Sequence, residues 1–249
     1  MNFLVIGEKC RDIFVYGEVA RLSPEAPVPI FKPLRTVENE GMANNVYNNL
    51  FSLIEKKATV VGHFSSGGIK KTRLVEEKSN HYFIRIDEND RVDPIVINDY
   101  LIKIIKGADC ILISDYDKGF LTLPDIWKIC KEKRKEAVVF LDSKKELTSG
   151  IIDSVDFVKL NEYEYKKNIL QSETHKEKIV ITLGAKGARY NDQDFPSIKK
   201  ITNDVSGAGD TFLAALAFYY MERKDIKYAI ERANKAASEV VSERGVSVI

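Results

Sequence analysis

The sequence has few of the residues that build metal centres or disulfide frameworks, with three cysteines and three histidines among 249 residues. Cys10, Cys110 and Cys130 lie far apart, so they show neither a paired metal-binding spacing nor a disulfide pattern. The histidines are equally scattered, which favours ordinary packed or surface side chains over zinc ligands. We therefore expect no structural metal and a reducing, cytoplasmic compartment.

Charge of one sign and long apolar runs are also scarce. The formal net charge is +1 and the basic residues are spread along the chain, which disfavours partners such as nucleic acids and anionic membranes. The apolar stretch Phe212–Met221 is too short to span a bilayer, and Met1–Gly7 is too short for a signal peptide. The expected partner is a small molecule.

Three common catalytic motifs are missing. The sequence contains no Gly-x-x-x-x-Gly-Lys-Ser/Thr string, no Gly-x-Gly-x-x-Gly after the first strand and no Gly-x-Ser-x-Gly elbow. These absences argue against a P-loop ATPase, a dinucleotide-binding fold and a serine hydrolase.

What is present is an alternation of short apolar runs with helix-like stretches, in a chain that is 44% hydrophobic and 30% charged. The pattern predicts a largely parallel sheet covered by helices, in one main domain. The expected strands cover residues 2–6, 58–61, 110–114, 137–141, 155–160 and 178–183. The expected helices cover residues 43–55, 98–106, 124–134, 161–170, 207–223 and 226–242.

One region departs from this alternation. Residues 13–32 are interrupted by Pro24, Pro27 and Pro29, and proline in a sheet is found mostly on edge strands. Residues 81–87 alternate weakly and are a possible partner strand. We interpret both as a small β excursion from the main sheet.

The strongest chemical signal is the string Asp204-Val-Ser-Gly-Ala-Gly-Asp210, which leads directly into an apolar helix. At a helix start the unpaired N–H groups of Gly207, Ala208 and Gly209 can bind one anion. Asp210 beside them can accept the proton of an attacking hydroxyl. A tight turn followed by an ordinary carboxylate in the first helical turn is the alternative.

This string resembles the anion-hole signature of the ribokinase-like, or PfkB, carbohydrate kinases. Arg21–Ile30 and Ser114–Gly119 resemble segments of the bacterial heptose 7-phosphate kinases, the kinase half of the bifunctional enzymes that make ADP-heptose. The resemblance runs in order over most of the chain. It implies a ribokinase-like three-layer α/β/α sandwich as one kinase domain over residues 1–249.

The resemblance also implies an activity and an additional structural element. We expect ATP-dependent and magnesium-requiring transfer of the γ-phosphate to a sugar hydroxyl, with the C1 hydroxyl of heptose 7-phosphate as the favoured acceptor. Another sugar or a catalytically silent nucleotide-binding module are the alternatives. A small β-sheet lid is expected from about residues 12–32 and 81–87, and in this family such a lid often pairs two subunits.

The same resemblance assigns roles residue by residue. Asp210 is the expected base, with Gly207, Ala208 and Gly209 as the anion hole. The expected substrate-binding residues are Asp12, Gly41, Asn44 and Lys144. The expected nucleotide-binding residues are Asn161, Glu164, Thr182, Gly184, Gly187, Asp204 and Asn234, with Glu164 also meeting magnesium through water.

Structural interpretations of these residues stay open beside the functional ones. Asn44 could be a helix cap, and Asn161 with Glu164 could form a helix start. The segment from Thr182 to Gly187 could be a plain hairpin turn. Asn234 could be a surface helix residue.

Three departures from the heptose-kinase pattern bear on the acceptor site. Glu40 replaces one glycine of an expected pair, and its side chain could point into or away from the sugar pocket. Glu8 stands where an aspartate is usual. Between Val61 and Tyr82 the chain is shorter than the pattern, as though a strand-and-helix unit after Gly62 were omitted.

Overall fold

A computed structural model describes residues 1–54, 58–198 and 206–241. Within them the main sheet has eight strands in the order β12-β11-β10-β9-β8-β7-β1-β4, and the strands from β10 to β4 run parallel. Their bounds are Asn2–Gly7 for β1, Thr59–Phe64 for β4, Cys110–Asp115 for β7, Val138–Ser143 for β8, Phe157–Asn161 for β9, Ile179–Thr182 for β10, Ala188–Tyr190 for β11 and Gln193–Phe195 for β12.

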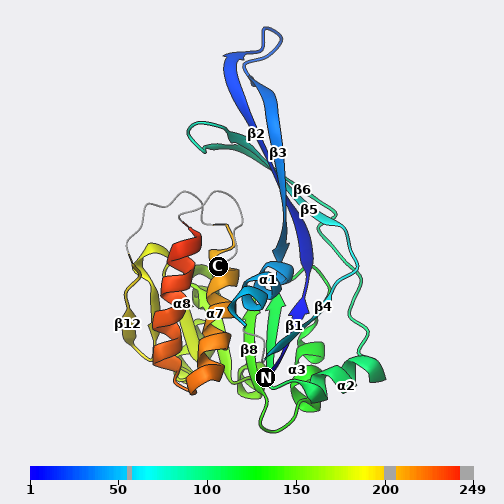
Figure 1. The fold of residues 1–249 in the computed structure, drawn as a ribbon, viewed down its shortest axis with the longest axis vertical. Helices are drawn as coiled ribbons and strands as arrows, with labels where there is room; N and C mark the ends of the chain where they lie inside the picture. Colours follow the sequence, from blue (N-terminus) through cyan, green and yellow to red (C-terminus); the bar gives the residue numbers. More distant parts are fainter. Residues whose placement is uncertain (55–57, 199–205, 242–249) are drawn as a thin grey trace.

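Helices cover both faces of this sheet (Figure 1). One face packs against α1 (Ala43–Leu53), α7 (Ala208–Arg223) and α8 (Ile226–Val240). The other packs against α2 (Asp99–Gly107), α3 (Leu123–Glu132) and α4 (Ser149–Ser154). Because both faces are covered, every residue of β7 and β8 is buried, as expected for parallel strands. The predicted three-layer α/β/α fold is confirmed.

A second sheet projects from the main body (Figure 1). Its four strands lie in the order β3-β2-β5-β6. They are β2 (Lys9–Leu22), β3 (Pro29–Met42), β5 (Ile69–Glu76) and β6 (Tyr82–Glu88). We call this sheet the lid. Residues 12–32 and 81–87 lie within or between its strands, but β2 and β3 are longer than the sequence predicted.

The connections between lid and core are short. Glu8 alone separates β1 from β2, and β3 runs directly into α1 at Met42. The edge strand β4 continues through residues 65–68 into β5, so no helix follows β4 before the lid. This is where the sequence suggested an omitted strand-and-helix unit.

One predicted helix is broken. The expected helix over residues 161–170 is two helices, α5 (Glu162–Lys167) and α6 (Ile169–Thr174). The break lies at the buried Asn168, whose Oδ1 accepts from the Leu147 amide at 2.6 Å and whose Nδ2 donates to the Glu164 carbonyl at 2.9 Å. These bonds tie the break to the segment that precedes α4.

The helices and cysteines of the described residues bear on membrane contact and on redox state. None of the helices there is long and apolar enough to cross a membrane. All three cysteines are buried and free.

Candidate functional site

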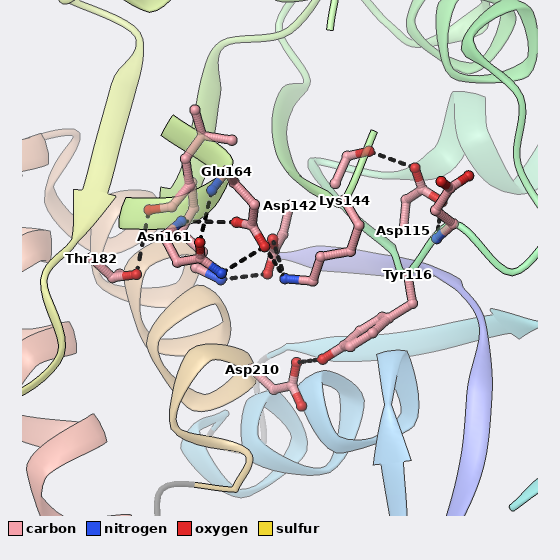
Figure 2. Close-up of polar contacts among 12 residues, drawn as sticks. Asp115, Tyr116, Asp142, Lys144, Asn161, Glu164, Thr182 and Asp210 are labelled. Carbon is pink, nitrogen blue, oxygen red and sulfur yellow. Dashed lines mark hydrogen bonds and ion pairs between the residues drawn. The ribbon is translucent and has the colours of Figure 1, made fainter. Parts of the chain in front are cut away.

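Polar side chains gather where the parallel strands end. Asp115 closes β7, Asp142 lies near the end of β8, Asn161 closes β9 and Thr182 closes β10 (Figure 2). The carboxyl ends of parallel strands share one edge of the sheet, which is where open α/β sheets bind ligands. A cleft of about 870 Å³ lies at this edge.

The cleft brings together most of the residues that the sequence assigned to phosphate and nucleotide. The predicted residues that line it are Lys144, Asn161, Thr182, Gly184, Gly187, Gly207, Ala208, Gly209, Asp210 and Asn234. Asp204 lies outside the described residues. Glu164 is buried behind the cleft wall, where its neighbours Glu162 and Tyr163 line the cleft instead.

The start of α7 lines the cleft with three consecutive residues that the sequence assigned to an anion-binding turn. Gly207 is the residue before the helix and has φ of 82°, a left-handed conformation that favours glycine. The first amides of α7 have no carbonyl one turn earlier to bind, so they can donate to a ligand. Gly207, Ala208 and Gly209 all line the cleft, so the geometry is that of an anion-binding turn.

The Asp210 side chain follows this turn and is only 5% exposed. Its Oδ1 accepts from the Tyr116 hydroxyl at 2.5 Å (Figure 2), and its Oδ2 accepts from Asn45 Nδ2 at 3.1 Å. Asn45 is held in turn by Asn49, which also accepts from the Thr211 hydroxyl. Burial raises the pKa of Asp210 to about 6, although the two hydrogen bonds lower it. The carboxylate is therefore mostly ionised at neutral pH, as a base must be.

A second and smaller cavity of about 150 Å³ lies on the lid side of Asp210. Its lining residues are Asp12, Met42, Lys71, Arg73, Tyr116, Ser206, Gly207 and Asp210. Three of them, Tyr116, Gly207 and Asp210, also line the large cleft. Asp210 therefore faces both cavities.

Asp12, predicted to hold the sugar, lies in this smaller cavity. Arg73 Nη1 donates to Asp12 Oδ1 at 2.5 Å, and both side chains are nearly buried. Gly41 lies on the neighbouring strand β3, where a Cβ would come 1.9 Å from Asp12 Oδ2. A side chain at position 41 would displace this carboxylate. Gly41 thus makes room for Asp12, although Gly41 itself is not among the lining residues.

Asn44, predicted to bind the sugar, lies in the first turn of α1. It is buried at the start of α1 and lines neither cavity, whereas the adjacent Asn45 contacts Asp210. The residue before α1 is Met42, so a helix-capping role for Asn44 is not observed either. The sugar-binding role of Asn44 stays a prediction.

An ion-pair network occupies the wall of the large cleft (Figure 2). Lys144 Nζ pairs with Glu164 Oε1 and lies 3.8 Å from Asp142 Oδ1. On the other side, Lys159 Nζ donates to Asp142 Oδ2 at 2.6 Å. Burial alone would lower the pKa of Lys144, but the carboxylates of Asp142 and Glu164 outweigh it and raise that pKa. Lys144 is thus a fixed cation on the cleft wall.

Asn161 and Glu164 form the helix start that the sequence left open as an alternative. The Asn161 side chain accepts from the Glu164 amide, and Glu164 Oε2 accepts from the Asn161 amide, which together make a capping box.

Both carboxylate oxygens of Glu164 already accept hydrogen bonds. The carboxylate therefore suits a magnesium ion that keeps its water ligands better than one that it would bind directly. The buried Asp142 Oδ1 has no hydrogen-bond partner among the described residues and can accept from a metal-bound water.

The remaining nucleotide candidates lie on β10, on the hairpin that follows it and on α8, and all of them line the cleft. Thr182 ends β10, Gly184 begins the short 3₁₀ helix η1 (Gly184–Lys186) and Gly187 follows it, all inside the β10–β11 hairpin. This segment is thus a hairpin turn, as the alternative interpretation expected, and it also lines the cleft. Asn234 is a buried residue of α8 rather than a surface one, and its Nδ2 donates to the Phe195 carbonyl at 2.9 Å.

The two unusual glutamates are not among the residues that line either cavity. Glu40 is exposed on β3 and lines neither cavity. Glu8 is fully buried, and its carboxylate accepts from the amides of Tyr116 and Lys118 at 2.9 and 3.0 Å. Glu8 therefore fixes the loop after β7, and this loop holds Tyr116 in hydrogen-bonding contact with Asp210.

The sequence did not single out five residues that the structure places at the site, namely Asn45, Lys71, Arg73, Tyr116 and Lys159. Lys159 had a signal, because a lysine inside an otherwise apolar run predicted as a core strand requires a partner. Tyr116 lies within Ser114–Gly119, which resembled the heptose kinases. The other three depend on pairing between distant strands and helices, which no local pattern reports.

Comparisons with known proteins agree with this geometry. Residues 112–248 match the pfkB family of carbohydrate kinases. The chain belongs to this family. The bifunctional protein HldE of Helicobacter acinonychis (strain Sheeba) is 30% identical over 294 aligned positions, and that of Helicobacter pylori (strain G27) is 31% identical over 296. Each alignment covers 98% of this chain but 63% of the relative. The pfkB-family chain therefore spans less than two thirds of these relatives.

Solved structures share the fold of this pfkB-family chain. Thermotoga maritima ribokinase has a TM-score of 0.73 at 17% identity, with 98% of this chain and 94% of that chain covered. Escherichia coli phosphofructokinase-2 in complex with potassium has a TM-score of 0.74 at 13% identity, with 100% and 94% covered. Arabidopsis thaliana ribokinase complexed with ribose and ATP has a TM-score of 0.69 at 16% identity, with 98% and 93% covered. The predicted ribokinase-like fold is thereby confirmed.

The raised pKa of Asp210 makes a prediction about stability. Its folded pKa of about 6 exceeds the ordinary 3.8, so ionisation of this group costs the folded state free energy as pH rises from about 4 to 6. The cost at pH 7 is at most about 3 kcal/mol. Asp210→Asn removes the titration, so its unfolding free energy relative to the unsubstituted chain should rise between pH 4 and pH 7. Urea unfolding at both pH values measures this.

The matched control is Asp93→Asn, an exposed aspartate that lines neither cavity. This control should show no such pH-dependent gain. A difference between Asp210→Asn and the unsubstituted chain that stays constant from pH 4 to pH 7 would contradict the raised pKa.

Proposed function

We propose that this chain is an ATP-dependent kinase of a sugar phosphate, with the C1 hydroxyl of heptose 7-phosphate as acceptor. The observation that carries the proposal is the position of Asp210, a buried carboxylate that faces a large cleft on one side and a small cavity on the other. Membership of the pfkB family supports the reaction class. The likeness to the HldE proteins supports the acceptor.

The large cleft suits the nucleotide. Its volume of about 870 Å³ lies within the range of small-molecule sites, roughly 300–1,000 Å³. The first amides of α7 and the cation Lys144 supply donors for the phosphates. Thr182, Gly184 and Asn234 lie on the wall where the rest of the nucleotide would bind.

The small cavity suits an anionic sugar. Asp12 offers acceptors for hydroxyl groups, while Lys71 and Arg73 bring two cations from β5. Arg73 is paired with Asp12. Lys71 has no carboxylate partner among the described residues, and its Nζ lies 5.2 Å from the Tyr116 ring centroid. An unpaired cation beside the acceptor position favours a phosphorylated sugar over a neutral one.

The proposed reaction moves one proton and one phosphoryl group. Asp210 accepts the proton of the acceptor hydroxyl as its oxygen forms a bond to the γ-phosphorus. The bond from the γ-phosphorus to the bridging oxygen breaks, and ADP leaves with that oxygen. The amides at the start of α7 stabilise the negative charge on the transferring group. Tyr116 and Asn45 keep the base oriented toward the hydroxyl.

Magnesium would be held through water by Glu164 and Asp142. When bound, the ion neutralises negative charge on the phosphates. Glu164 contributes through the Lys144 and Asn161 contacts that fix its carboxylate.

The compartment and pathway are part of the proposal. Phosphorylation at C1 of heptose 7-phosphate is a step toward ADP-heptose and lipopolysaccharide precursors. The buried free cysteines support a reducing, cytoplasmic environment.

We also propose a homodimer through the lid. Four apolar side chains of β6 are exposed, and they are Tyr82 at 44%, Phe83 at 42%, Ile84 at 52% and Ile86 at 44%. Strand β6 is also an edge of the lid sheet. A dimer would cover both the apolar side chains and the edge.

Sedimentation of the unsubstituted chain should give twice the monomer mass. Ile84→Lys should shift the measured mass toward that of the monomer, because it places a charge in the apolar contact. A monomeric unsubstituted chain at micromolar concentration would contradict the proposed dimer.

Loss of the base should reduce turnover selectively. Asp210→Asn retains one acceptor for the bonds from Tyr116 and Asn45 but cannot take a proton, so kcat should fall about 10²- to 10⁴-fold. ATP affinity, measured by calorimetry, should change little. Asp93→Asn should retain full turnover. Unchanged kcat in Asp210→Asn would remove Asp210 from its role.

The acceptor is tested with a panel of sugars. ADP release is measured with ATP, magnesium and heptose 7-phosphate, other sugar phosphates, and neutral hexoses and pentoses, and kcat/KM should be highest for heptose 7-phosphate. Lys71→Gln should raise the KM for a phosphorylated acceptor at least about tenfold, because one charge-assisted hydrogen bond is lost, while the KM for ATP stays constant.

The matched control is Lys70→Gln, the preceding residue on β5, which does not line the cavity. Preference for another sugar would reject heptose 7-phosphate and keep the kinase. Binding of ATP with no turnover of any acceptor would instead favour the catalytically silent module.

A further inference from the structure

Lys159 is a charged residue in the middle of a core strand. It is the third residue of β9, whose other residues are apolar up to Asn161 at its end, and its side chain is only 4% exposed. Burying an ammonium group is costly unless it is paired. Lys159 is also among the residues that line the large cleft.

The contacts of Lys159 connect the sheet to the start of α7. Its Nζ donates to Asp142 Oδ2 at 2.6 Å. A Cβ built on Gly209 would lie 3.3 Å from the same Nζ. The ammonium group therefore lies directly against the turn whose amides are free to bind an anion.

The pairing of Lys159 leaves donors unused. An ammonium group has three N–H donors, and among the described residues Asp142 is the one acceptor within hydrogen-bond distance. Asp142 itself has a second neighbouring cation, since Lys144 lies 3.8 Å from its Oδ1. Two lysines thus face the cleft around a single carboxylate, and Glu164 compensates Lys144 alone.

We propose that Lys159 is a catalytic residue that binds the transferring phosphoryl group together with the amides of Gly207–Gly209. This inference rests on the proposed nucleotide site and adds a fixed side-chain charge to it. Asp142 holds the ammonium group against Gly209, so the charge is in position before the substrate arrives. Such preorganised charge stabilises the negative charge that spreads over the phosphoryl oxygens during transfer.

The test separates the γ-phosphate from the rest of the nucleotide. Lys159→Gln can still donate to Asp142 but has no charge. Calorimetry in magnesium should show ATP affinity about tenfold weaker, because a charge-assisted hydrogen bond to the γ-phosphate is lost. ADP, which has no γ-phosphate, should bind within about threefold of the unsubstituted chain. With acceptor present, kcat should fall about 10²-fold or more, as when one oxyanion donor is removed.

The matched control is Lys178→Gln. Lys178 is a partly buried lysine beside β10 that donates to the carbonyls of Ile152, Asp153 and Val155, and it does not line the cleft. It should leave ATP affinity, ADP affinity and kcat unchanged. If Lys159→Gln does not fold, Lys159→Gln combined with Asp142→Asn removes both buried charges and allows the same comparison of ATP with ADP.

Three outcomes would overturn the proposal. Equal losses of ATP and ADP affinity would make Lys159 a structural residue, and unchanged ATP affinity and kcat would make it a bystander. In both cases the unsubstituted chain still binds and uses ATP, so the proposed function stands. An unsubstituted chain that binds neither nucleotide would overturn the proposed function and this inference together.

Discussion

The hydrogen bonds to the buried Asp210 carboxylate join three separate parts of the chain at one point. Asp210 lies in the first turn of α7, Tyr116 follows β7, and Asn45 belongs to α1. Burial raises the pKa of Asp210 to about 6, which makes the carboxylate a better proton acceptor than an exposed aspartate while it stays largely ionised at neutral pH. The same burial lowers the free energy of unfolding, and packing of the surrounding helices and sheet must offset that loss. The buried carboxylate of Asp210 is therefore maintained at a cost in folding stability.

The ion pairs on the cleft wall also cost folding stability. Lys144, Lys159, Asp142 and Glu164 alternate in sign and are mostly withdrawn from water. Apolar residues of similar size would stabilise such a site equally well or better, because desolvation offsets much of the attraction within buried ion pairs. Their presence in the wall of a cavity is explained by what they offer a ligand. For the proposed nucleotide, such a wall supplies cations whose positions do not depend on solvent.

Much of the core could be predicted from the sequence, because apolar runs and helical periodicity are local signals. The parallel strands from β1 to β10 and the helices α7 and α8 fall close to their expected ranges. The turn before Asp210 could also be predicted, since its glycines are adjacent to that aspartate in the sequence. Strand β5 was missed because its sequence, Ile69–Glu76, carries charges on both sides of short apolar pieces. Lys71 and Arg73 were missed with it. Asn45 rather than Asn44 contacts Asp210 because helix α1 rotates one of two adjacent amides toward α7, a choice that depends on packing.

The near absence of linkers between the two sheets has a consequence for how specificity can change. The strands that wall the small cavity continue from β1 and β4 of the core with one residue or four residues between them, and β3 passes into α1 with none. In such a molecule the walls of the small cavity and the core elements beside the large cleft share continuous stretches of backbone. Exchange of a whole loop would shift both together. Under the proposed function, a change of acceptor therefore depends on point substitutions along β5 rather than on exchange of a loop.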